Sequence, residues 1–161
     1  MNFLKLLLIL CLSFSANTQL NMNLLSNLDY QTLHDADLND IWGYVDETGK
    51  EYALVGTTKG TSVVDISDPA NPVEVFWEPG TESVWRDLKT WGDYAYITTE
   101  AQDGILIIDL SPLPGSTNLP TSYYFGEGFP PLVSAHNIYI DEIGRAYIFG
   151  SNRGVGGVQI L

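Results

Sequence analysis

Residues 60–67 read Gly-Thr-Ser-Val-Val-Asp-Ile-Ser, and residues 104–111 repeat that order of residue types as Gly-Ile-Leu-Ile-Ile-Asp-Leu-Ser. A third copy starts at Gly157 as Gly-Val-Gln-Ile-Leu and stops one residue before the expected aspartate. Sequence that recurs along a chain is the signature of a protein assembled from repeated structural units. The chain therefore predicts a repeat architecture.

A second repeated segment lies upstream of each copy. This segment occurs at residues 51–55, 93–97 and 144–148. In each copy an alanine follows Tyr or Arg and precedes an apolar pair. From the first repeat to the second, equivalent positions are 42 residues apart for Ala53 and Ala95, and 44 for Gly60 and Gly104.

The interval from the second repeat to the third is longer by 9 residues in both segments. The extra length lies upstream of Ala146. We assign it to residues 112–131, which contain five prolines and three glycines. Such a composition is typical of loops, so we expect an exposed insertion there.

Each repeat predicts about four short strands and no helix. The apolar, β-branched runs at 63–64 and 105–108 stand beside glycine, as in strands buried on both faces, while 46–50 and 68–72 have turn composition. About four strands in ~42–45 residues match a propeller blade better than a sandwich. The predicted fold class is all-β, with four-stranded blades of β-propeller type and about three repeats, the last one truncated: 38–80, 81–125 and 132–161.

Three blades are too few to close a ring, because propellers have about four to eight. We therefore expect residues 1–161 to form the N-terminal part of a longer protein; the alternative is an open array of three units. Residues 22–28, in an N-terminal segment spanning 19–37, resemble a lone strand. In a closed ring this strand would complete the outer edge of the last blade.

Residues 1–18 have the order of a secretory signal peptide. Lys5 precedes an apolar run at 6–14, and small and polar residues follow, which favours cleavage before Gln19. The run is far shorter than the ~20 residues that span a bilayer; the alternative is a buried N-terminal helix or a membrane anchor. The only cysteine, Cys11, lies inside the run, so the mature chain has no disulfide. We expect a secreted or cell-surface protein with no transmembrane span in this segment.

The chain is strongly acidic, with 7 Lys and Arg against 20 Asp and Glu and a net charge of −13. Such a surface repels the phosphate backbone of nucleic acids, so nucleic-acid binding is disfavoured. An extracellular protein or a glycan is the expected kind of partner.

Several segments, in this order, resemble the choice-of-anchor B family, whose members are built of LVIVD repeats. The similar segments are 38–46, 51–56, 60–72, 106–109 and 134–141. The resemblance implies a secreted or surface-held bacterial propeller with a C-terminal anchoring or sorting signal, which would lie beyond Leu161. It implies no particular biochemical activity.

Enzyme motifs are nearly absent from the sequence. It contains no phosphate-binding loop, no G-x-S-x-G and no H-E-x-x-H, and its only histidines are His34 and His136. The sequence therefore indicates no catalytic residue and no metal ligand, and it leaves any cofactor unknown.

One set of polar residues recurs at a fixed position in the repeats. The first strand of each repeat has an apolar start at Ile41, Leu88 or Ile138, and two polar residues precede each start. Innermost strands line the channel of a propeller, so these side chains should converge at its mouth, where convergent polar groups form a ligand site. The predicted ligand-binding residues are Asp40, Arg86, Asp87, His136 and Asn137.

Structural roles compete with this interpretation. An Asp or Asn at a fixed position also holds the backbone of an adjoining turn. This role is favoured for Asp40, Asp87 and Asn137 as well as for Asp65 and Asp109, whereas a turn requires neither Arg86 nor His136. The four tryptophans, at positions 42, 77, 85 and 91, fit packing between blades better than a sugar-binding surface. The predicted function is a non-catalytic binding or scaffold propeller; the alternative is an exported enzyme with its active site in the central channel.

Overall fold

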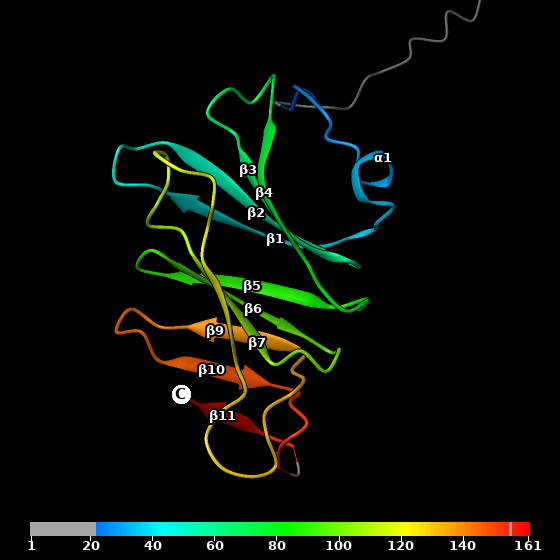
Figure 1. Ribbon diagram of the computed structural model, residues 1–161, viewed down its shortest axis with the longest axis vertical. Coiled ribbons are helices and arrows are strands. Elements are labelled where there is room, and N and C mark those ends of the chain that lie inside the picture. Colours follow the sequence, from blue (N-terminus) through cyan, green and yellow to red (C-terminus); the bar gives the residue numbers. More distant parts are fainter. Residues whose placement is uncertain (1–21, 155) are drawn as a thin grey trace, which may run out of the picture.

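The computed structural model describes residues 22–154 and 156–161. The predicted signal peptide (1–18) and Cys11 lie outside the described residues. The described chain forms three antiparallel sheets, stacked along the long axis of the molecule like successive blades (Figure 1). The predicted all-β class with blade-like repeats is confirmed.

The strands follow the chain from sheet to sheet. The first sheet has the order β1-β2-β3-β4: Leu38–Val45, Glu51–Thr57, Gly60–Asp65 and Val73–Pro79. The second has the order β5-β6-β7-β8: Arg86–Trp91, Tyr94–Thr99, Ile105–Asp109 and Thr121–Tyr124. The third has three strands in the order β11-β10-β9: Asn137–Ile140 (β9), Ala146–Phe149 (β10) and Val158–Ile160 (β11). The last repeat of the chain is therefore a three-stranded sheet.

Apolar side chains between the sheets form the core. Leu54 and Val63 of the first sheet pack against Leu88, Ile97 and Ile108 of the second, and all five are buried. A second cluster, around Ile105, Ile138 and Ile148, joins the second sheet to the third. Full burial of such a side chain contributes about 1.5–3 kcal/mol. Packing between blades is thus the main source of stability.

One turn recurs in the first and third sheets. Asp46 Oδ1 accepts the backbone N–H groups of Thr48 (2.8 Å) and Lys50 (3.0 Å), and its Oδ2 accepts the Tyr52 hydroxyl at 3.2 Å. Asp141 makes the equivalent three contacts in the third sheet, at 3.1, 2.9 and 3.0 Å. Both turns also contain a glycine with positive φ, which fixes the direction of the hairpin.

The N-terminal segment covers the outer face of the first sheet. It contains a short helix that was not predicted, α1 (Tyr30–His34), whose N-cap Asp29 accepts the backbone N–H of Gln31 at 3.0 Å. Tyr30 and Leu28 pack on Val55 and Val64 of the sheet face opposite the second sheet. No helix of the described chain is long and apolar enough to cross a membrane.

Residues 22–28, the candidate ring-closing strand, pair with no sheet among the described residues, and their pairing with a further blade stays a prediction. These residues have no regular structure, and Ser26 Oγ bonds to Pro69 O at 2.7 Å beside the first sheet. Met22, Leu24 and Leu25 are all exposed, so they do not alternate between a buried and an exposed face as a paired strand would.

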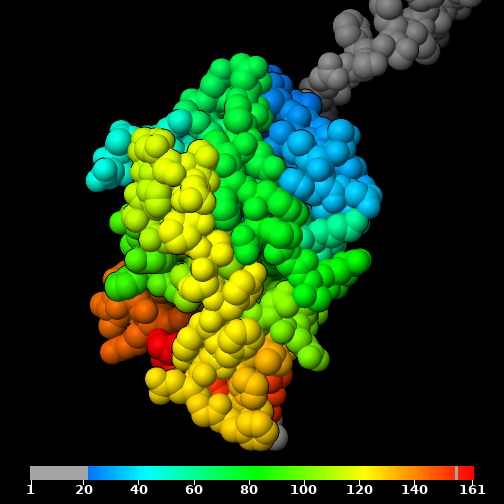
Figure 2. Space-filling model, in the orientation of Figure 1, coloured from blue at the N-terminus to red at the C-terminus, as the bar shows by residue number. Residues whose placement is uncertain are grey.

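The exposed loop predicted for residues 112–131 is only partly correct. Strand β8 lies inside this range, and Leu113 and Leu119 are buried in the core between the first two sheets. The segment, coloured yellow, runs across one face of the stack from the first sheet to the third (Figure 2). The extra length is shared between the β7–β8 and β8–β9 connections. Proline and glycine mark the turns but do not show that leucines between them are buried.

Candidate functional site

A pocket of about 200 Å³ lies where the innermost strands β1, β5 and β9 begin. Strand β5 contacts both β1 and β9, so residues at the same repeat position lie close together. The pocket is lined by all five predicted ligand-binding residues and by two more: Asn39, Asp40, Trp85, Arg86, Asp87, His136 and Asn137.

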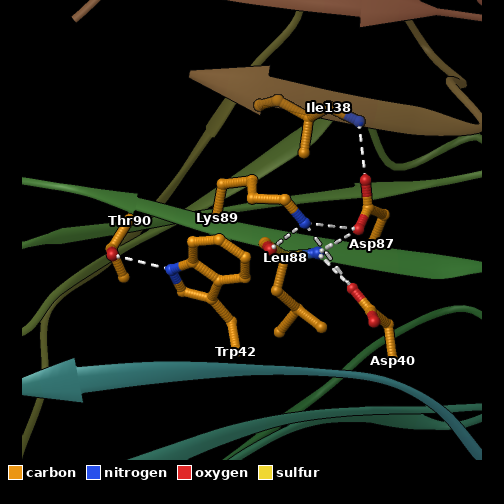
Figure 3. Close-up of polar contacts among 7 residues, drawn as sticks. All are labelled: Asp40, Trp42, Asp87, Leu88, Lys89, Thr90 and Ile138. Carbon is orange, nitrogen blue, oxygen red and sulfur yellow. Dashed lines mark hydrogen bonds and ion pairs between the residues drawn. The ribbon is translucent and has the colours of Figure 1, made fainter. Parts of the chain in front are cut away.

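Two of the aspartates bond to the backbone of the next sheet. Asp40 Oδ2 accepts the backbone N–H of Leu88 at 3.3 Å, and Asp87 Oδ2 accepts that of Ile138 at 2.7 Å (Figure 3). When the repeats are aligned, each aspartate stands one position before the residue whose N–H it accepts in the next blade. The innermost strands are edges of their sheets, so an outward N–H lacks a strand partner. We call these contacts the interblade aspartate bonds. They differ from the turn-holding role considered above, because the bonded backbone belongs to another blade.

Lys89 joins the two carboxyl groups. Its Nζ lies 2.9 Å from Asp87 Oδ1 and 3.8 Å from Asp40 Oδ2, and 4.4 Å from the centre of the Trp42 ring. The Trp42 Nε1–H donates to Thr90 Oγ1 at 3.0 Å (Figure 3). The first and second blades are therefore joined here by hydrogen bonds, an ion pair and a cation–π contact.

The two carboxyl groups have different acidities. Burial and the hydrogen bond with Asp40 raise the pKa of Asp87. Burial acts in the same sense on Asp40, but hydrogen bonds from Asp87 and from the backbone N–H groups of Ile41 and Leu88 keep the pKa of Asp40 below its usual value. Asp40 is therefore the more readily ionised member of the pair.

Arg86 lines the pocket, but its guanidinium group is directed elsewhere. Nη2 donates to the backbone carbonyl of Thr81 at 2.7 Å, and it would lie 2.6 Å from a Cβ at Gly80. The side chain is 4% exposed, and burial lowers its pKa, while the charge of Asp103 acts in the opposite direction. Arg86 is thus an interior cation beneath the 80–81 backbone.

The remaining lining residues form the open rim of the pocket. Trp85 is 51% exposed, and its ring centre lies 5.1 Å from that of His136, whose Nδ1 is 2.8 Å from Glu100 Oε1. The Asn39 Nδ2 donates to Val84 O at 2.6 Å, while its Oδ1 is buried with no hydrogen-bond partner among the described residues. The Asn137 side chain is exposed at the position that Asp40 and Asp87 occupy in their blades.

The other predicted structural roles are largely as expected. Asp65 Oδ1 and Asp109 Oδ1 accept the backbone N–H two residues later, at 3.0 and 2.9 Å, so their turn-holding role is confirmed. Trp91 packs against Gly144 of the third blade, and Trp77 stacks on His34 at 3.6 Å. Trp85 alone among the four tryptophans has an open ring beside the pocket.

The sequence analysis missed three participants: Asn39, Trp85 and Lys89. The sequence contains a pattern that could have identified the first two as pocket residues, because Asn39 occupies the repeat position of His136 and Trp85 immediately precedes Arg86. No such pattern marks Lys89, since its role depends on contact with the preceding blade. Within residues 22–154 and 156–161, no group of three or more His, Cys, Asp or Glu side chains is arranged to hold a metal ion.

Stacked four-stranded sheets, joined through their innermost strands, define a repeat protein made of propeller-type blades. Comparison with known families identifies the repeat: the LVIVD repeat matches residues 49–77 and 85–123. The first match runs from β2 into β4, and the second from just before β5 into β8. Parts of the first and second blades are thus similar to the LVIVD repeat. No curated protein and no solved structure matches the chain.

Proposed function

We propose that this chain is the blade-forming part of a secreted or cell-surface protein that binds a partner without catalysis, with the pocket at β1, β5 and β9 as its binding site. The resemblance to the choice-of-anchor B family, the apparent signal peptide and the two matches to the LVIVD repeat support this proposal. Attachment to the cell would then depend on a C-terminal signal of the kind that this family carries.

The interblade aspartate bonds are the observation that carries the non-catalytic assignment. Asp40 and Asp87 are the pocket's only carboxylates, and each accepts a backbone N–H of the next blade. A general acid or base must instead be directed at the substrate. The free groups, Trp85 and Asn137, are side chains suited to contact and hydrogen bonding.

The second candidate, an exported enzyme, is favoured by one observation. Asp40 and Asp87 are neighbouring carboxyl groups, both in contact with Lys89, and their pKa values are shifted in opposite directions. Paired carboxyl groups with separated pKa values occur in acid–base catalysis. The backbone bonds weigh against this role, because proton transfer would break the contact between blades.

A thermal-shift screen against extracellular metabolites, peptides and glycans separates the two candidates. Compounds that raise Tm should be recovered chemically unchanged after long incubation, since a binding protein does not convert its ligand. Product formation that Asp87→Asn abolishes would establish the enzyme and refute our proposal.

Export has its own test. N-terminal sequencing of protein recovered from the medium or the cell surface should find Gln19 as the first residue. Retention of Met1 on intracellular protein would contradict export.

A further inference from the structure

We propose that the pocket binds one neutral pyranose ring of a glycan, stacked on Trp85. This inference rests on the proposed binding function and names its ligand class. It follows from the size of the pocket, from the open face of one tryptophan, and from the kinds of polar groups around it.

The size of the pocket fits a small cyclic ligand. Its volume is about 200 Å³, whereas sites for drug-sized molecules occupy roughly 300–1,000 Å³. It is lined by residues of three blades, so several sides of a ring could be contacted at once. Its rim, formed by Trp85, His136 and Asn137, is accessible to solvent.

Trp85 is held in place but its ring is open. The Ser83 hydroxyl donates to the Trp85 backbone carbonyl at 2.9 Å, and Ser83 Oγ accepts the Trp85 backbone N–H at 3.3 Å. His136 contacts the ring from one side. A large, rigid apolar surface next to polar groups suits a ligand with one apolar face and hydroxyl groups at its edge, as a pyranose has.

The polar groups suit hydroxyls. Asn39 Oδ1 is buried without a partner among the described residues, and the bond from Nδ2 to Val84 O fixes its direction. No solvent reaches this oxygen, so the accessible amide of the pocket is that of Asn137. The exposed Asn137 amide can both donate and accept.

The charges around the pocket favour a neutral ligand. Arg86 is the only lysine or arginine that lines the pocket, and its Nη2 donates to Thr81 O. Lys89 lies behind the pocket, against Asp87 and Asp40. Lys89 compensates the carboxyl groups of Asp40 and Asp87, so the open rim of the pocket offers no uncompensated cation to phosphate, sulfate or an acidic sugar. The ligand class is therefore a neutral sugar.

The test is a titration of the full chain with neutral oligosaccharides built on glucose, galactose or mannose, and with sialylated or uronic-acid oligosaccharides. Isothermal calorimetry and intrinsic tryptophan fluorescence report binding. We expect a neutral oligosaccharide to bind, and Trp85→Ala to weaken it at least tenfold. Tyr94→Ala is the control, because Tyr94 is 42% exposed and pairs with Trp91 at the other end of β5; it should keep the affinity.

Asn137→Ala keeps the proposal testable if Trp85→Ala fails to fold, because this exposed side chain can be removed without loss of packing. It should weaken the same oligosaccharide severalfold. Binding of acidic oligosaccharides alone, no binding at all, or affinities unchanged in both variants would overturn the glycan proposal. A peptide that binds in a Trp85-dependent manner would refute the glycan and leave the binding function standing.

Discussion

A carboxylate at one fixed repeat position joins each blade to the backbone of a buried leucine or isoleucine in the next. The edge of a sheet leaves backbone N–H groups without strand partners, and burial between blades makes such a group costly unless it is bonded. Asp40 and Asp87 supply the missing acceptor for Leu88 and Ile138. This explains why the acid recurs at one repeat position.

Removal of the Asp87 carboxylate should destabilise the protein much more than removal of that of Asp40. Asp87→Ala leaves the Ile138 N–H buried and Lys89 without its closer partner, so we expect a loss of about 2–3 kcal/mol in urea unfolding. Asp40→Ala should cost less than about 1 kcal/mol, because the side chain is 40% exposed and the Leu88 N–H keeps its 3.1 Å contact with Asp87. Equal losses would contradict this account.

Acid should destabilise the protein through the turn aspartates. Burial opposes ionisation of Asp46 and Asp141, but bonds from backbone N–H groups and a tyrosine hydroxyl outweigh it and lower both pKa values. A lowered folded-state pKa gives stability that is complete above the unfolded value of about 3.9 and is lost as the pH falls through the folded value.

Melting temperature measured from pH 6 to pH 2 tests this prediction. Tm should fall most steeply below about pH 4, and Asp46→Asn should be less stable at pH 6 and show a shallower fall. An identical pH profile in wild type and Asp46→Asn would refute the role of Asp46.

At the scale of the element, the hairpin turns at Asp46 and Asp141 have matched backbones in different surroundings. Gly49 has φ +85° and Gly144 φ +84°, a region that favours glycine. A Cβ at Gly49 would meet nothing within 4 Å, whereas one at Gly144 would lie 2.5 Å from the Trp91 ring. The glycine in the third blade therefore permits close packing as well as the turn.

Alanine at the two positions separates these effects. Gly49→Ala should cost about 1–2 kcal/mol from backbone strain alone. Gly144→Ala should cost clearly more, because Trp91 must also move away from the third blade. Denaturant unfolding measures both, and equal costs would show that Trp91 packing on Gly144 contributes nothing.

Strand positions were predictable because their information is local. Glycine beside a β-branched run marks β3 and β7, and the repeat carries the same assignment to β11. The alignment of the repeats at Ile41, Leu88 and Ile138 also identified five residues that line one pocket. The backbone N–H groups that Asp40 and Asp87 accept were not predictable, because every residue type except proline has a backbone N–H and the sequence does not show which one lies nearby in the next blade. Helix α1 was missed because five residues are too few to show helical periodicity.

At the scale of the whole molecule, the two ends of the stack differ. The outer face of the first blade is covered by Leu28 and Tyr30 of the N-terminal segment. The third blade has no such cover among the described residues: Tyr139, Phe149, Val158 and Ile160 are exposed. Val63 and Ile107 occupy the repeat position of Ile160, and each packs between blades. The exposed face is thus an unused blade interface.

The chain, expressed as residues 19–161, should therefore self-associate through its third blade. Ile160→Lys should reduce the association seen by sedimentation velocity, because a charge on this apolar face opposes its burial. Ile41→Lys is the control: Ile41 is 63% exposed against 61% for Ile160, but it lies on the first blade. A monodisperse wild-type monomer at high concentration would contradict the prediction.

Amide hydrogen exchange at Ile138, followed by NMR, tests most directly the claim that interblade aspartate bonds hold the blades together. This N–H lies on the edge of its sheet and, in the structure, bonds to Asp87 Oδ2 at 2.7 Å. We predict slow exchange in the wild-type chain, and fast exchange at Ile138 in Asp87→Ala while the amides of β6 stay protected. Wild-type exchange at Ile138 as fast as in an exposed loop would show that the bond does not exist.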